Sequence, residues 1–289
     1  MKTSGFQAFR EGPRGRADGE IFWIIKKFIE SRGSFSDIVE FPPVAFKQNF
    51  LKGSNIVGEK AYEFADKKGR QLILTPDPQV HTFDNHIASR GRGRGRYSWI
   101  SPAFRYRHAP TRHFYQIGYT SINFKLSNEA DEIILGLETL SNFVANVCKE
   151  KVTVLLVHPS LALKITELRG DGSQIVGSYI YGQIDENHVR SCWETDELNF
   201  AQTITELNTL KNVVTYFSEH GTVNCQLDLK KTYSQETLSG TGFIIEVLGK
   251  KIGDGGIYSE YGSRYDERIQ SVMSICTGVN PFLRILNLL

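Results

Sequence analysis

The chain has few of the residues that crosslink small secreted proteins or bind metal ions. It contains 4 cysteines and 2 methionines among 289 residues. The cysteines lie far apart, at Cys148, Cys192, Cys225 and Cys276. No spacing between them fits a pair of metal ligands or a disulfide framework. We therefore expect four reduced and mostly buried thiols, in a protein of the cytoplasm.

Long apolar runs and paired histidines at metal-ligand spacing are also missing. No stretch of 18 apolar residues occurs, so the sequence predicts no membrane span. The first twelve residues, MKTSGFQAFREG, lack the apolar segment of a signal peptide. His81 and His86 are five residues apart, a poor spacing for two ligands on one face of a helix. We expect no metal site at these histidines.

The chain also lacks a strong net charge, since 34 basic residues face 32 acidic ones and the balance is +2. The charge is nevertheless unevenly distributed. Residues 90–112 hold seven arginines and no acid, so the rest of the chain is net negative. Such a local excess indicates a site rather than a general coat for nucleic acid. The hydrophobic fraction of 40% is ordinary, and a chain of this length can bury a core without crosslinks.

Arginine and glycine alternate strictly over residues 90–96, RGRGRGR. This composition cannot pack a core, so it predicts a flexible loop. Two roles stay open for this loop. It is either a solvated basic surface or a contact for nucleic acid or another anionic partner.

A hairpin follows the basic run. Apolar and polar residues alternate over 97–104 and again over 114–122, which predicts two half-buried strands around a turn at 109–111. Arg105, Arg107 and Arg112 cluster near that turn, with Phe114 at its base. Guanidinium groups and an aromatic ring suit an anionic, flat ligand such as a nucleotide. The alternative is a surface hairpin with solvated arginines.

The remaining pattern predicts a single α+β domain over residues 1–289. We expect helices over 19–31, 79–89, 129–147, 160–168 and 198–218, the third with Asn128 as N-cap. We expect strands over 37–41, 59–64, 71–74, 151–157, 222–229 and 241–247. Residues 170–182 are glycine-rich and weakly defined, 253–258 and 262–266 are predicted turns, and 272–289 mixes strand and helix signals.

Five segments resemble motifs of class II aminoacyl-tRNA synthetases, in the order of the histidyl branch. WISPAFRYRHAPTRHFYQIG, at 99–118, resembles motif 2. EFPPVAF resembles the motif 1 strand, and GRQLILTPDPQ resembles the strand and turn that follow it. TGFIIEV with the glycine turn at 262–266 and GVNPFLRIL, similar to motif 3, complete the set. The resemblance implies an antiparallel sheet flanked by helices, and a homodimer built by residues 20–31 and 37–44.

Several positions depart from the charging enzymes of this branch. A second arginine, Arg107, follows Arg105, and only eight residues separate Arg105 from Phe114. Residues 234–240 contain neither the arginine nor the aromatics expected there, and Thr120 replaces a ligand-binding glutamate. No anticodon-binding domain is expected after motif 3. These departures are more similar to the regulatory subunit of ATP phosphoribosyltransferase, a paralogue that does not charge tRNA.

Three functions follow from the resemblance and the composition. The first is a regulatory subunit in histidine biosynthesis, which binds a small amino-acid-like ligand and a short catalytic partner. The second is an ATP- and Mg-dependent ligase that adenylates an amino acid or another carboxylate other than histidine. The third is an RNA-binding or scaffold protein that uses residues 90–96.

The resemblance also implies roles for single residues. Arg105 would neutralise a phosphate or carboxylate, and Phe114 would stack on a flat ring. Gln116 and Asp77 would hold an amino-acid head group. Arg284 would reach terminal phosphates and would act with Arg105 if the chain is an enzyme. The other expected ligand-binding residues are Arg107, Arg112, Arg264 and Tyr265.

Overall fold

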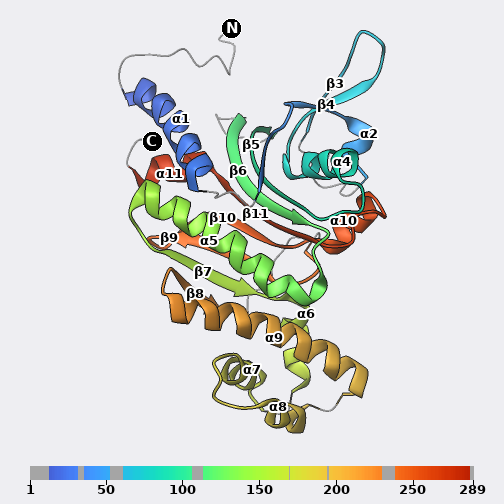
Figure 1. Cartoon of the computed structure of the whole chain (residues 1–289), viewed down its shortest axis with the longest axis vertical. Coiled ribbons are helices and arrows are strands. Elements are labelled where there is room, and N and C mark those ends of the chain that lie inside the picture. Colours follow the sequence, from blue (N-terminus) through green and yellow to red (C-terminus); the bar gives the residue numbers. More distant parts are fainter. Residues whose placement is uncertain are drawn as a thin grey trace.

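The computed structural model describes residues 13–31, 36–52, 61–105, 113–168, 170–193, 195–229 and 238–286. An eight-stranded sheet with the order β1-β5-β6-β11-β10-β9-β7-β8 forms the centre of the molecule. A three-stranded sheet, β2-β4-β3, lies at one end, and a lobe of short helices lies at the other (Figure 1). Arg107, Arg112 and the turn at 109–111 fall outside the described residues.

Strands and helices are interspersed along the described parts of the chain, often as consecutive pairs of strands. The strands are β1 (Asp37–Glu40), β2 (Val44–Phe46), β3 (Tyr62–Ala65), β4 (Gln71–Leu74), β5 (Gly95–Phe104), β6 (His113–Ile122), β7 (Val152–Val157), β8 (Val223–Leu227), β9 (Gly242–Val247), β10 (Lys250–Ile257) and β11 (Val272–Gly278). The helices are α1 (Pro13–Ser31), α2 (Lys47–Phe50), α4 (Gln79–Ser89), α5 (Glu129–Cys148), α6 (Pro159–Lys164), α7 (Gly172–Ile180), α8 (Glu186–Cys192), α9 (Glu197–His220), α10 (Ser259–Tyr265) and α11 (Val279–Ile285).

The large sheet is mostly antiparallel. Only its two outer pairs, β1 with β5 and β7 with β8, are parallel. A parallel pair needs a long crossover, and the helices α6 to α9 supply it between β7 and β8. An antiparallel sheet flanked by helices is the α+β architecture that the sequence predicts, and this prediction is confirmed.

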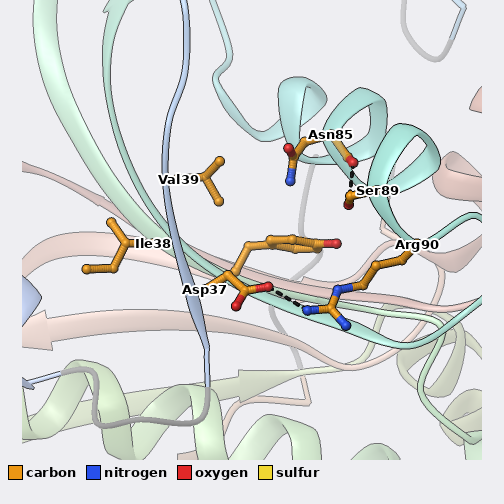
Figure 2. Close-up of a pocket in the computed structure, with 7 residues that line it drawn as sticks. Asp37, Ile38, Val39, Asn85, Ser89 and Arg90 are labelled. Carbon is orange, nitrogen blue, oxygen red and sulfur yellow. Dashed lines mark hydrogen bonds and ion pairs between the residues drawn. The ribbon is translucent and has the colours of Figure 1, made fainter.

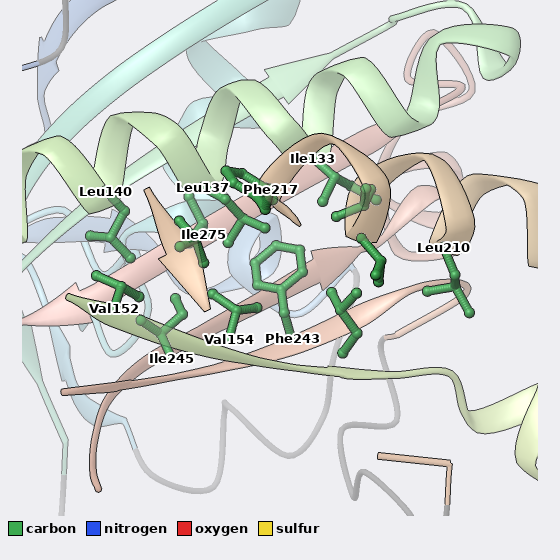
Figure 3. Packing of buried hydrophobic residues seen from close by; sticks show 14 of the residues in the cluster. Ile133, Leu137, Leu140, Val152, Val154, Leu210, Phe217, Phe243, Ile245 and Ile275 are labelled. Atoms are coloured by element: carbon green, nitrogen blue, oxygen red, sulfur yellow. The ribbon is translucent and has the colours of Figure 1, made fainter. Parts of the chain in front are cut away.

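Each face of the sheet buries its own core. Figure 3 shows the larger core, in which α5 and α9 pack on strands β7, β9 and β11 through residues such as Leu137, Phe217 and Phe243. The opposite face packs on α4 and α10, with Phe83 and Tyr261 among the buried residues. Alternate residues of a strand point to the same face of the sheet. The apolar residues at every second position of these strands therefore gather in this core.

Three local predictions are wrong. The glycine-rich segment at 170–182 contains the helix α7, because Asp171 caps it by accepting from the backbone N–H of Gln174 at 3.2 Å. The predicted turn at 253–258 is mostly strand β10, and the predicted turn at 262–266 lies mostly in helix α10. Asn128 does precede α5, but its side chain makes no capping hydrogen bond.

The basic run at 90–96 is not a free loop. Its last two residues begin β5, and its arginines form ion pairs with acids elsewhere in the fold. Arg90 pairs with Asp37 at 2.7 Å, and Arg94 and Arg96 both pair with Glu132, whose side chain is fully buried. Residues 90–94 form a turn, in keeping with the predicted loop, while residues 95 and 96 belong to β5 and several of the arginines face carboxylates.

We predict that Arg96→Met lowers the free energy of unfolding by about 3 kcal/mol, because Glu132 keeps only one partner for a buried charge. Urea unfolding measures this change. Arg92→Met is the matched control from the same run, since Arg92 and its partner Glu267 are 68% and 88% exposed and 3.6 Å apart. Such a pair contributes little to stability. Equal losses for the two variants would contradict the structural role of Glu132.

The carboxyl group of Glu129, in the first turn of α5, should make the stability of the fold depend on pH. Burial, assisted by the negative charge of Glu206, raises the pKa of Glu129 from 4.5 to about 7. Between these two pH values the folded chain holds a proton that the unfolded chain releases, so stability falls as pH rises. Glu129→Gln should match the wild type in melting temperature near pH 4 and exceed it above pH 7. Glu219→Gln, at an exposed position of α9, is the control, and a pH-independent difference would contradict this assignment.

Candidate functional site

The face of the large sheet that lies opposite α5 carries the candidate site. Strand register places Trp99 opposite Gly118, and Gly118 opposite Cys276. Cys276 in turn lies opposite Asp254 of β10. Paired residues of antiparallel strands point to the same face, so these four residues form one row across the sheet.

A short connection holds Asp77 over this row. The loop between β4 and α4 is hydrogen-bonded on both sides, since the N–H of Thr75 donates to the carbonyl of Pro43 at 2.9 Å. The Arg105 Nε–H donates to the carbonyl of Pro76 at 2.8 Å, and the N–H of Phe104 donates to the carbonyl of Thr75 at 2.8 Å. Asp77 and Arg105 are therefore fixed relative to each other.

Burial and neighbouring charges both shift the pKa values of the titratable groups in this cluster. Burial raises the pKa of Asp77, while the positive charge of Arg105 opposes that shift and Asp254 adds to it. Burial also raises the pKa of the Cys276 thiol, and Asp254 and Asp77 contribute in the same direction. Asp254 forms an ion pair with Lys251 at 2.5 Å. The Cys276 thiol thus lies near two carboxylates, Asp77 with Arg105 close by and Asp254 with Lys251 close by.

Gln116 is the polar group of the cluster that lacks a partner. It lies on β6, opposite Ser101 and Gly278, and is 7% exposed. Its Oε1 atom is buried and accepts no hydrogen bond from the residues that the structure describes. A buried acceptor without a donor costs about 1–3 kcal/mol, so this atom indicates a place for an N–H or O–H group of a ligand.

The structure brings together four of the residues expected at the site, namely Asp77, Arg105, Phe114 and Gln116. The Arg105 guanidinium lies over the Phe114 ring, with its central carbon 5.5 Å from the ring centroid. Phe114 and Gln116 project from the same face of β6 because they are two residues apart. The cluster can hold both ends of a zwitterion, with a cation at Asp77 and Gln116 and an anion at Arg105.

Three other expected residues make contacts elsewhere or are exposed. Tyr265 is buried in the second core, where its hydroxyl donates to Asp84 at 2.8 Å. Arg264 is exposed on α10, and its Nε–H donates to the Glu260 carbonyl at 3.3 Å. Arg284 is exposed in the last turn of α11. Pro281 of the same helix lies beside Gly278. A Cβ atom added to Gly278 would come within 3.4 Å of Pro281 and 3.9 Å of Phe114.

Sequence reasoning missed Trp99, Asp254, Cys276 and Ser274 as residues of this face. Trp99 lies in the segment that resembles motif 2 but was given no role there, and the other three have ordinary places in strands. Their proximity depends on the register between β5, β6, β11 and β10. No local signal in the sequence encodes that register.

The two histidines have structural partners. His81 Nε2 lies 2.8 Å from the Thr75 hydroxyl, and His86 Nδ1 lies 2.9 Å from the Tyr97 hydroxyl. Within the described part of the chain, no group of three or more histidine, cysteine or acidic residues is placed to hold a metal ion. The described helices also include none that is long and apolar enough to cross a membrane.

A cavity of about 330 Å³ lies away from the cluster, between β1 and α4 (Figure 2). It is lined by Asp37, Ile38, Val39, Asn85, Ser89, Arg90 and Tyr97. The ion pair between Asp37 and Arg90 lies in its wall, and Ile38 is 44% exposed. Among the described strands β1 is an edge strand of the large sheet, so this cavity opens beside a sheet edge.

Sequence and structure comparisons both find relatives among histidyl-tRNA synthetases. No family model matches the chain. Among curated proteins it is 28% identical over 166 residues to a histidine–tRNA ligase of Thermotoga petrophila, and 34% identical over 166 residues to one of Thermotoga sp. strain RQ2. Each match covers 55% of this chain and 37% of the ligase. The chain therefore spans well under two thirds of these relatives.

Solved structures match over almost the whole chain. An ATP phosphoribosyltransferase regulatory subunit/histidyl-tRNA synthetase from Bacillus halodurans superimposes with a TM-score of 0.72 at 16% identity, over 99% of this chain and 83% of that one. The apo histidyl-tRNA synthetase of S. aureus gives 0.69 at 13% identity, over 99% and 73%. By fold the chain is a class II aminoacyl-tRNA synthetase-type core, and its sequence relatives are histidine–tRNA ligases.

Proposed function

We propose that the chain is a regulatory paralogue of histidyl-tRNA synthetase, and that it supports a short ATP phosphoribosyltransferase catalytic subunit in histidine biosynthesis. Its sheet face binds a small amino-acid-like ligand. The observation that carries this proposal is the buried, unpartnered Oε1 of Gln116 in the same cluster as Asp77 and Arg105. The fold shared with a regulatory subunit/histidyl-tRNA synthetase supports it.

The cluster suits an ammonium group at one end of the ligand. An ammonium donates to Gln116 Oε1 and to the Asp77 carboxylate, and its positive charge offsets the cost of burying that carboxylate. Arg105 is then available for the carboxylate of the same ligand, while its Nε–H stays on Pro76. An α-amino acid presents these two charges one carbon apart.

Adenylate formation is disfavoured by the arrangement of cations around the cluster. Such a reaction develops negative charge on phosphate, which needs positive groups aimed at it. Beside Phe114 and Gly278 the structure has Pro281, and Arg284 lies further along α11 in its last turn. The described residues 238–240 carry no cation either. Binding without catalysis is therefore the better account of this site.

The exposed surface of β1 and α1 supports a homodimer, which is part of the same proposal. β1 is an edge strand, and α1 carries the exposed residues Phe22, Trp23 and Ile29. A second copy that covers β1 and α1 would bury these side chains and the cavity beside Tyr97.

We predict that Asp77→Asn and Gln116→Leu each weaken binding of the amino-acid ligand by about tenfold or more, because each removes a charge-assisted hydrogen bond. Isothermal titration calorimetry against a panel of amino acids measures the change. Gln71→Leu, at an exposed position of β4, is the matched control and should bind like the wild type. Unchanged affinity in both site variants would place the ligand elsewhere.

We also predict no ATP–pyrophosphate exchange above background with any amino acid. Co-expression with a short-form catalytic subunit should yield a complex in which light scattering counts two copies of this chain. The amino-acid ligand should change the phosphoribosyltransferase rate of that complex. Exchange with a single amino acid would overturn the regulatory proposal in favour of an adenylating ligase.

A further inference from the structure

A chain of hydrogen-bonded side chains lies on the same sheet face, on the side of Gly118 away from Gln116. The Trp99 Nε1–H donates to Thr120 Oγ1 at 2.9 Å, and Thr120 Oγ1 lies 2.9 Å from Ser274 Oγ. Ser274 donates its own hydrogen to the Tyr119 carbonyl at 3.4 Å, so Thr120 is the donor to Ser274. The Thr120 hydrogen is thus committed inside the protein, and neither Trp99 nor Thr120 has any exposed surface.

The Trp99 ring covers the glycine that separates this chain of hydroxyls from the cluster. A side-chain carbon at Gly118 would lie 2.3 Å from Trp99 Cζ2 and 2.5 Å from Cε2, so the ring rests directly on the backbone of β6. Only glycine leaves room for that approach. The indole therefore fills the space between Gln116 and Thr120, which both project from the same face of β6.

Two further rings hold the indole in place. The Phe41 ring centroid lies 6.3 Å from that of Trp99, and Phe41 stacks on His81 at 5.5 Å with an interplanar angle of 27°. The Thr75 hydroxyl donates to the Pro42 carbonyl at 3.2 Å, so it accepts from His81 Nε2 at 2.8 Å. Phe41 and His81 are 5% and 7% exposed, so the indole packs against rings that are themselves buried.

We propose that Trp99, backed by Phe41 and held by Thr120, is the residue that limits the ligand of this site to a small side chain. This inference rests on the proposed function, since it assumes that an amino-acid head group binds at Asp77 and Gln116. The indole covers the sheet face at Gly118, next to Gln116. We therefore expect glycine, alanine and serine to bind beside Gln116, and the larger side chains of histidine and phenylalanine to collide with Trp99.

The test measures binding of glycine, alanine, serine, histidine and phenylalanine by titration calorimetry. The wild type should bind the three small amino acids about tenfold or more tightly than the two large ones. Trp99→Ala should reverse or abolish that preference by opening the space. Trp99→Phe, which keeps more of the packing, should raise the affinity for histidine by a smaller factor. Trp23→Ala is the matched control, since Trp23 is 36% exposed on α1.

The outcomes separate the two proposals. A wild type that binds histidine as tightly as glycine overturns the role of Trp99 and leaves the proposed function standing. A wild type that binds no amino acid overturns the proposed function, and this inference with it. Thermal unfolding identifies the Trp99 variants that fold. If the folded variants keep the wild-type order of preference, Trp99 does not set it.

Discussion

The pairing register of β6 with β5 and β11 is the constraint on which the candidate site depends. This register places Gln116, Gly118 and Thr120 on the face away from α5, and it places Ile117 and Tyr119 in the large core. A slip of one residue would exchange the two sets and bury Gln116 under α5. The packing of Ile117 and Tyr119 in the core therefore fixes the positions of Gln116, Gly118 and Thr120, which lie on the sheet face of the candidate site.

Most of the elements could be predicted from the sequence, because their apolar residues recur with a clear period. The hairpin at 97–122, the helix α9 and the strand β9 are examples. Helix α7 and strand β10 could not be predicted, because their glycines lower both propensities and only tertiary packing decides the outcome. Of the site, Asp77, Arg105, Phe114 and Gln116 were accessible through motifs, whereas Trp99, Asp254 and Cys276 meet them only through strand register.

The basic run shows how a composition signal can mislead. Seven arginines without an acid suggest an anionic ligand, yet Arg94 and Arg96 are directed at a single buried carboxylate 36 or more residues away in the chain. Arg105, by contrast, donates its Nε–H to the carbonyl of Pro76 and lies close to Asp77. Whether an arginine is available for a ligand depends on distant acids, which a local count of charges does not include.

The crossover between β7 and β8 has a consequence for the order of folding. It spans 65 residues, from 158 to 222, whereas 8 residues, 105 to 112, join β5 to β6. Loop-closure entropy grows with the logarithm of loop length, so bringing β8 to the sheet costs roughly 2 kcal/mol more than closing the hairpin. Burial of the α9 residues Leu207, Leu210 and Val213 offsets this cost only when the helical lobe has formed. The strand β8 at one edge of the sheet thus depends on its lobe, while β5 and β6, which carry Trp99 and Gln116, pair locally.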